Sequence, residues 1–149
     1  MLWRGLPAYA SFAVALLAGC QRNISGYYVA SDNSAVIWLQ VVPTPDNHLT
    51  GQLAANVLRP DGAVEQDSAS ITGTVDGDNV TIRGSRLFGL ESFVLSGMQS
   101  GNVLTLTGEQ SVPRTFTRST PAAFQTKVAE LKIRSQSILR AKGGRRLNP

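Results

Sequence analysis

The sequence is poor in the residues that carry most enzyme chemistry. Among its 149 residues there is one cysteine, Cys20, and one histidine, His48. A single cysteine cannot form a disulfide within the chain, so a folded domain must be held together by packing alone. His48 stands beside a turn and we expect it on the surface, where it supports neither a catalytic triad nor a multi-histidine metal site.

Carboxylates are also sparse and scattered. Charged residues make up 16% of the chain, compared with about 25% in an average protein. The segment Asp76–Asn79 lacks the further acids and terminal glutamate of an EF-hand calcium loop, so we interpret it as a hairpin turn. No phosphate-binding glycine loop is present. We therefore expect a protein that is not an enzyme and that has no catalytic, cofactor or metal residues. The remaining candidates for a paired-carboxylate site stand singly: Glu65, Asp67, Glu91 and Glu109.

Charge is unevenly distributed along the chain. Residues 21–118 carry six basic and nine acidic side chains, a net charge of −3, whereas residues 119–149 carry seven basic and one acidic, a net charge of +6. Such a basic tail is able to attract anionic lipid or a partner. Because no aromatic residues are interleaved with these cations, we expect no binding to nucleic acid.

The first twenty residues differ from the rest in composition. Arg4 precedes an apolar run, Gly5–Gly19, which is shorter than the roughly 20 residues that span a bilayer as a helix. The run ends in Leu17-Ala18-Gly19-Cys20, which resembles the lipobox of bacterial lipoprotein signal peptides. The resemblance implies cleavage before Cys20, attachment of diacylglycerol to its thiol and acylation of its new amine. Two or three acyl chains hold a protein stably on a membrane.

This resemblance implies boundaries between segments of the chain and a cellular location for the protein. Residues 1–19 become a signal peptide, and residues 20–25 become the lipidated cysteine and a short tether that keeps the following domain close to the bilayer. The implied location is the bacterial cell envelope, with the outer membrane facing the periplasm as the leading choice. An uncleaved membrane anchor and ordinary secretion with a free thiol are the alternatives.

Residues 26–118 form a series of short alternating segments separated by turns. Eight such segments predict a mainly β fold, an antiparallel up-and-down meander that forms a small barrel or a strongly curved sheet. In the clearest segment, Leu49, Gly51, Leu53, Ala55 and Val57 share a face that we expect to be buried, and Thr50, Gln52, Ala54 and Asn56 share a wet face. Pro43 and Pro45 are expected to end the second strand. The other residues expected to point inward are Ile71, Val75, Ile82, Phe93, Leu95, Leu104, Leu106 and Phe116.

A weak repeat places glycine inside several of these strands. Glycine follows an apolar residue and a Ser or Thr at positions 51, 73, 97 and 108. Glycine weakens a strand unless it permits a bend, a bulge or the close approach of another backbone. The repeat therefore predicts a strongly curved sheet.

A second resemblance rests on the ends of this region. Gly26-Tyr27-Tyr28 on the first strand, with Arg114 or Arg118 on the last, is similar to the calycin (lipocalin-like) arrangement, in which Gly-x-Trp opens the barrel and a basic residue packs across the aromatic ring. Tyr28 stands where tryptophan is usual. Eight strands enclose a space just wide enough for their own side chains or one small ligand, and we favour the filled barrel over the hollow one.

After the strands the apolar period changes from 2 to 3.6. Thr120 is able to cap a helix and Pro121 to begin it, and Gly143-Gly144 ends it, which predicts a helix over residues 119–143 and a basic tail over 144–149. We expect its apolar face to pack on the barrel; a coiled-coil contact with another subunit and adsorption to anionic lipid are the alternatives. That face carries Phe124, Val128, Leu131, Ser135, Ile138 and Leu139.

These features predict an envelope lipoprotein anchored to the membrane through Cys20. We expect it to act as a non-enzymatic binding or interaction module for a protein partner. The alternative is a lipocalin-like carrier that holds a small hydrophobic ligand in the barrel mouth.

Overall fold

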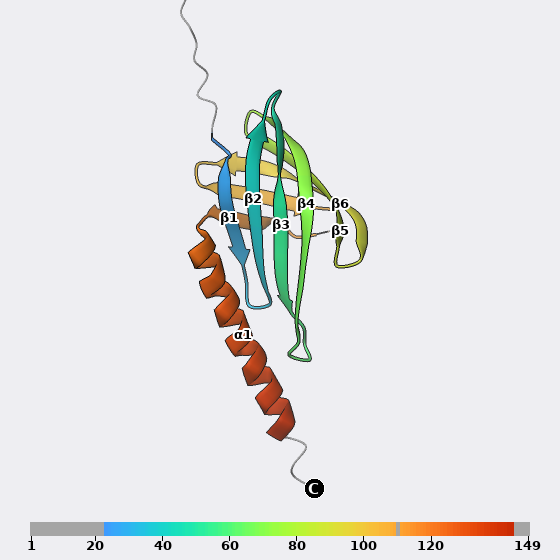
Figure 1. Ribbon diagram of the computed structural model, residues 1–149, viewed down its shortest axis with the longest axis vertical. Coiled ribbons are helices and arrows are strands. Elements are labelled where there is room, and N and C mark those ends of the chain that lie inside the picture. Colours follow the sequence, from blue (N-terminus) through green and yellow to red (C-terminus); the bar gives the residue numbers. More distant parts are fainter. Residues whose placement is uncertain (1–22, 110, 145–149) are drawn as a thin grey trace, which may run out of the picture.

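The chain forms an eight-stranded antiparallel barrel followed by one helix (Figure 1). The computed structural model describes residues 23–109 and 111–144; the predicted signal peptide (residues 1–19), Cys20 and all but the first residue of the predicted basic tail (144–149) lie outside this range. Each strand pairs with the next, and β1 pairs with β8 through Tyr28↔Arg118 and Val29↔Thr117, so the sheet closes on itself. The prediction of a mainly β up-and-down meander is confirmed, and the meander forms a closed barrel rather than an open, strongly curved sheet. The strands are β1 (Gly26–Ser31), β2 (Ala35–Thr44), β3 (His48–Leu58), β4 (Val64–Asp76), β5 (Asn79–Leu87), β6 (Leu90–Ser100), β7 (Val103–Gly108) and β8 (Arg114–Arg118).

Strands β2 to β6 are longer than the sequence pattern suggests. Pro43 does not end β2, because the strand continues to Thr44 and Pro43 lies opposite Leu49 of β3. Strand β1 begins only opposite Val41, so β2 has a free edge beyond that point and the missing N–H of Pro43 leaves no ladder bond unmade. Strands β5 and β6 also continue through Gly84 and Ser85, since they pair down to Leu87↔Leu90.

Apolar side chains from all eight strands fill the barrel. Every residue expected to point inward from β4 to β8 belongs to this core or packs directly against it, and Leu49 and Leu53 of β3 do so as well. Thr50 and Gln52 on the other face of β3 are exposed, which confirms the strand facing there. The buried members of the core are Ile24, Tyr28, Ala30, Leu39, Val41, Leu49, Leu53, Ile71, Val80, Ile82, Leu104, Leu106 and Phe116.

Glycines mark the places where neighbouring strands come closest. A Cβ atom at Gly51 would lie 1.8 Å from the Gln40 carbonyl oxygen, and one at Gly97 would lie 1.8 Å from the Thr105 carbonyl oxygen. A Cβ atom at Gly73 would be similarly confined, at 2.0 Å from the Thr81 carbonyl oxygen. The repeat therefore has the predicted physical role at three of its four positions, since no side chain fits there without separating the strands.

The helix α1 (Pro121–Gly144) packs on the outer face of the barrel over β1, β2 and β3. Its first turn is capped as predicted, since the Ala123 N–H donates to the Thr120 hydroxyl at 3.2 Å. Val128 and Leu131 are buried against Val36 of β2. The expectation that the apolar face packs on the barrel is confirmed over this half of the helix. No helix among the described residues is long and apolar enough to cross a membrane.

Helix packing changes which side chains of β3 are wet. Asn56 points away from the barrel interior, yet only 5% of its surface is exposed, because it lies opposite Val36 on the wall that α1 covers. Its side-chain oxygen accepts a hydrogen bond from the Gln66 amide. The prediction that Asn56 is solvent-exposed is therefore wrong. The alternation of β3 could not reveal its burial, because the helix that covers it is about 70 residues away in sequence.

From Ser135 onward the helix contacts the β3–β4 turn, where Lys142 donates a hydrogen bond of 2.9 Å to the Pro60 carbonyl oxygen. Ser135 is buried and its hydroxyl donates to the Gly62 carbonyl in the β3–β4 turn. Leu139, expected on the packed face, is 51% exposed. Figure 1 shows the chain entering the barrel near one pole, while the end of α1 extends past the barrel at the opposite pole.

Candidate functional site

The barrel is sealed at the end where the chain enters. Ile24 lies in the hydrophobic core with 3% of its surface exposed. The Tyr28 hydroxyl donates a hydrogen bond of 2.9 Å to the Ile24 carbonyl oxygen. The stretch expected to be a free tether is thus bound to the barrel from Asn23 onward, and only Gln21 and Arg22 separate it from Cys20.

Arg118, at the end of β8, binds this entry segment from the other side. Its Nη2 donates to the Asn23 carbonyl oxygen at 2.6 Å and to the Tyr28 hydroxyl at 2.9 Å, and its Nη1 donates to the Ser25 carbonyl oxygen. The guanidinium carbon lies 5.0 Å from the centroid of the Tyr28 ring, within range of a cation–π contact. We call this arrangement of Tyr28, Arg118 and Gln99 the entry clasp.

The entry clasp matches the arrangement implied by the calycin resemblance. A basic residue from the last strand packs across an aromatic residue of the first, with tyrosine in place of tryptophan. Of the two candidates the structure selects Arg118, because Arg114 instead donates to the Asp32 carboxylate at 2.8 Å near the opposite end of β8. The closed eight-stranded barrel is consistent with the lipocalin-like resemblance at the level of fold.

Gln99 is the member of the entry clasp that sequence reasoning missed. Its polar side chain gave no reason to expect burial, yet it lies in β6 with 4% of its surface exposed. Its amide nitrogen is 3.3 Å from the Gly101 carbonyl oxygen and 3.5 Å from both the Asn23 carbonyl oxygen and the Tyr28 hydroxyl. The signal was present, since Gln99 continues the inward alternation of Phe93, Leu95 and Gly97.

The side chains of the entry clasp act as hydrogen-bond donors to backbone carbonyls. Burial raises the pKa of the Tyr28 hydroxyl above its ordinary value, and the nearby Arg118 charge and hydrogen bond oppose that rise only in part. Tyr28 therefore keeps its proton at neutral pH and donates it to a backbone carbonyl. Every buried side-chain nitrogen and oxygen in the described part of the chain has a hydrogen-bond partner. Tyr28, Gln99 and Arg118 together fix the backbone of residues 23–25.

A polar groove lies at the other end of β1, between the β1–β2 turn and α1. Its volume is about 170 Å³. Partial burial would raise the pKa of the Asp32 carboxyl, but hydrogen bonds from Ser34, Arg114 and Ala35 outweigh it and lower the pKa to about 2. The charges in the groove are already engaged, since Lys127 pairs with Glu130 at 3.2 Å. The lining residues are Ser31, Asp32, Asn33, Val36, Lys127, Glu130 and Arg134.

The residues weighed for catalysis or metal binding lie apart. His48 is exposed at the start of β3, and Asp76–Asn79 forms the tight β4–β5 turn. Glu65 pairs with Arg59 at 2.7 Å, and Asp67 accepts a hydrogen bond from the Phe88 N–H. Across residues 23–109 and 111–144, no three His, Cys, Asp or Glu side chains gather as a metal site would require.

The predicted lipid-attachment residue, Cys20, lies outside the described residues, so its modification stays a prediction from sequence. The nearest described position is Asn23, held in the entry clasp. Comparisons of the chain with protein-family models, with curated proteins and with solved structures found no match.

Proposed function

We propose that the protein is a lipoprotein of the bacterial envelope, anchored through an acylated Cys20 and acting as a non-enzymatic interaction module. The lipobox Leu17–Cys20 carries the proposal. The outer membrane, with the barrel facing the periplasm, is the proposed location. The barrel would then serve as a rigid body held at the bilayer surface, which presents its walls and helix to a partner.

The entry clasp supports this proposal by the way it shortens the tether. Because Asn23 is bound by Arg118, only two residues separate the acylated position from a fixed point on the barrel. Three residues extend over at most about 11 Å. The sealed end of the barrel would therefore face the headgroups, and the opposite pole with the end of α1 would face away from the membrane.

The test is incorporation of an alkyne-labelled fatty acid into the full-length chain, followed by membrane fractionation. Wild type should take up the label and sediment with membranes. Cys20→Ser should lose the label and accumulate as an unprocessed or released protein. The matched control is the double variant Cys20→Ser with Gln21→Cys, which keeps one thiol but moves it out of the lipobox position. Labelling of this control, or full membrane retention of Cys20→Ser at normal size, would contradict the lipoprotein proposal.

A carrier of a small hydrophobic ligand is the second candidate. The closed barrel with an apolar interior favours this function. The entry clasp closes the barrel at the end where the chain enters. The carrier function is opposed by the side chains that occupy that interior, among which Leu39, Ile82 and Leu104 have no exposed surface. A ligand that binds only the folded state raises the melting temperature as its concentration increases. A screen of fatty acids, isoprenoids and haem-like compounds that yields a saturable, competitive shift would favour the carrier.

A further inference from the structure

The helix α1 carries positive charge that its own side chains do not balance. It has five basic side chains and one acidic side chain, Glu130. Glu130 pairs with Lys127 at 3.2 Å. Arg134 and Lys142 donate hydrogen bonds to backbone carbonyls, which satisfy their N–H groups without neutralising their charge. The helix therefore presents a net positive charge on the barrel wall.

Two of these cations have no partner. Lys132 and Arg140 are exposed, and within residues 23–109 and 111–144 neither makes a hydrogen bond or an ion pair. Ile133 lies between them in the sequence and is 64% exposed, one of the most exposed large apolar side chains described. We call Lys132, Ile133 and Arg140 the cationic ridge. The chain leaves an apolar group and two unpaired charges together on one helix.

The cationic ridge has the spacing of a contact between helices. Ala129, Ile133, Gln136 and Arg140 follow one another at intervals of four, three and four residues, which places their side chains in one row along the helix. All four are exposed. A second helix lying along this row would meet an apolar side chain at Ile133 and a positive charge at Arg140, with Lys132 at the border.

The bilayer that anchors the protein lies too far away to occupy the cationic ridge. The helix begins near the anchored end, since the Ser119 N–H donates to the Tyr27 carbonyl oxygen at 2.8 Å, and it runs toward the opposite pole (Figure 1). At 1.5 Å per residue, Lys132 lies about 16 Å and Arg140 about 28 Å beyond Pro121. Attraction to charged headgroups is screened beyond about 8 Å at physiological ionic strength. This step rests on the proposed anchoring.

We propose that the cationic ridge binds an acidic, amphipathic helix of a partner protein. Carboxylates of that helix pair with Lys132 and Arg140, and one of its apolar side chains covers Ile133. Charge complementarity determines the class of partner, because the row contains cations and no acidic side chain. A second copy of α1 would meet the ridge with like charges and be repelled.

The test is the binding of two synthetic peptides to the full-length protein in phosphatidylcholine liposomes, measured by fluorescence anisotropy against empty liposomes. One peptide is an amphipathic helix with glutamate on its polar face, and the other has glutamine in place of every glutamate. The acidic peptide should bind, and the glutamine peptide should bind about ten-fold more weakly or less. Higher salt should weaken the binding of the acidic peptide.

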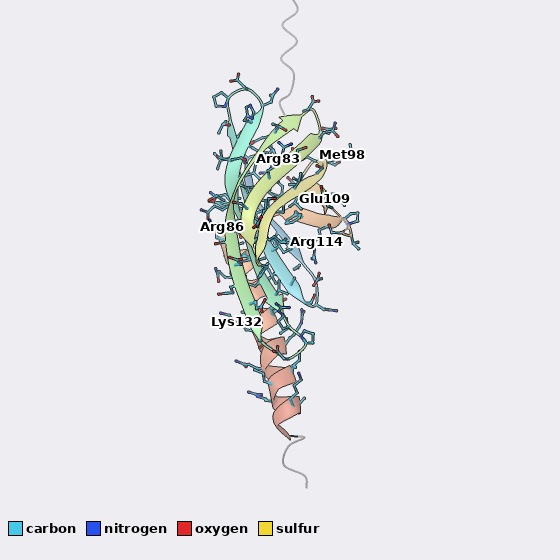
Figure 2. All side chains as sticks on the ribbon, turned by 90° about the vertical axis from the view of Figure 1, so that its right-hand side faces the viewer. Arg83, Arg86, Met98, Glu109, Arg114 and Lys132 are labelled. Atoms are coloured by element: carbon cyan, nitrogen blue, oxygen red, sulfur yellow. The ribbon has the colours of Figure 1, made fainter. Side chains whose placement is uncertain are left out.

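Charge reversal locates the binding surface. Lys132→Glu with Arg140→Glu should weaken binding of the acidic peptide by about ten-fold or more, and this variant should instead bind a peptide with lysine in place of glutamate. The matched control is Arg83→Glu with Arg86→Glu, which changes the net charge by the same amount at two exposed positions of β5. Figure 2 labels Lys132 on α1 and the two arginines on the barrel. The control should bind the acidic peptide as wild type does.

The apolar contact is tested by Ile133→Ser, which should weaken binding of the acidic peptide several-fold. Unchanged binding by this variant would mean that no helix covers the ridge. Equal losses in the two charge-reversal variants would mean that only overall charge attracts the peptide. Either result, or no binding of the acidic peptide to wild type, would overturn the proposal.

Anionic lipid is the competing occupant and has its own measurement. An environment-sensitive dye attached to Ile133→Cys should report water in liposomes that contain phosphatidylglycerol. A blue shift of its emission that disappears at high salt would identify lipid as the occupant and overturn the proposal. Failure of the anchoring shows separately, because the chain would then not float with liposomes, whereas its binding of the acidic peptide would still be measurable in solution.

Discussion

The guanidinium of Arg118 lies over the ring of Tyr28 and donates a hydrogen bond of 2.9 Å to its hydroxyl. The two residues come from the first and last strands, 90 positions apart in the sequence. Their contact joins the barrel across its closing seam, where β1 and β8 share only the pairs Tyr28↔Arg118 and Val29↔Thr117. Arg118 also binds the carbonyls of Asn23 and Ser25, so the same side chain closes the barrel and fixes the chain entry.

Replacement of Arg118 by alanine should lower the free energy of unfolding by about 2–3 kcal/mol, because it removes hydrogen bonds made by a charged donor to partly buried acceptors. Arg114→Ala is the matched control on the same strand. Its ion pair with Asp32 is exposed, and such pairs contribute at most about 1 kcal/mol. Urea unfolding of both variants checks the difference. Equal losses would mean that the entry clasp stabilises the barrel no more than a surface ion pair does.

The pH dependence of stability should reveal the hydrogen bonds of Asp32. The pKa of its carboxyl is about 2 in the folded protein and 3.8 without these contacts. A lowered pKa means that the carboxylate stabilises the fold above about pH 4, and that this contribution is lost as the pH falls toward 2. Asp32→Asn should remove that part of the acid dependence. Arg114→Gln should shift it to higher pH. Unfolding free energies measured between pH 5 and pH 2 give the comparison, and overlapping curves for Asp32→Asn and wild type would contradict it.

Alternation and turn residues predicted most of the barrel. Leu53 and Ile71 are buried where the period of two places them, and the strand glycines lie at close backbone approaches. Periodicity also predicted the helix, including Thr120 as its cap. These features are local, so each can be recognised from a few consecutive residues.

The features that sequence did not reveal depend on contacts between distant segments. Asn56 is buried because α1 covers it, and Pro43 is tolerated because β1 begins late opposite β2. Gln99 was not among the residues expected inside the barrel because it is polar, although its place in the alternation indicates the interior. The entry clasp was foreseen only as a choice between Arg114 and Arg118, because the register of β8 against β1 decides which of them reaches Tyr28.

The helix should contribute to stability through its first half. Leu131 has no exposed surface, and truncation of such a side chain to alanine should cost about 2–5 kcal/mol. Ile133→Ala, two residues along the same helix, should change stability by less than about 0.5 kcal/mol because Ile133 is largely exposed. Thermal unfolding of the two variants distinguishes a helix that packs on the barrel from a helix that serves only to bind a partner. An unchanged melting temperature for Leu131→Ala would show that α1 does not pack on the barrel.

The close strand contacts at glycine should be intolerant of a single methyl group. Gly97→Ala places a Cβ atom 1.8 Å from the Thr105 carbonyl oxygen and 3.0 Å from the Leu106 Cα, so β6 and β7 must separate. We expect a loss of about 3 kcal/mol, at the upper end of the usual cost of overpacking. Gly143→Ala is the control, because no atom lies within 4 Å of a Cβ atom there and alanine favours a helix. Its stability should be unchanged or slightly raised in the same denaturation experiment. A Gly97→Ala variant with the wild-type midpoint would mean that β6 and β7 pair in a different register.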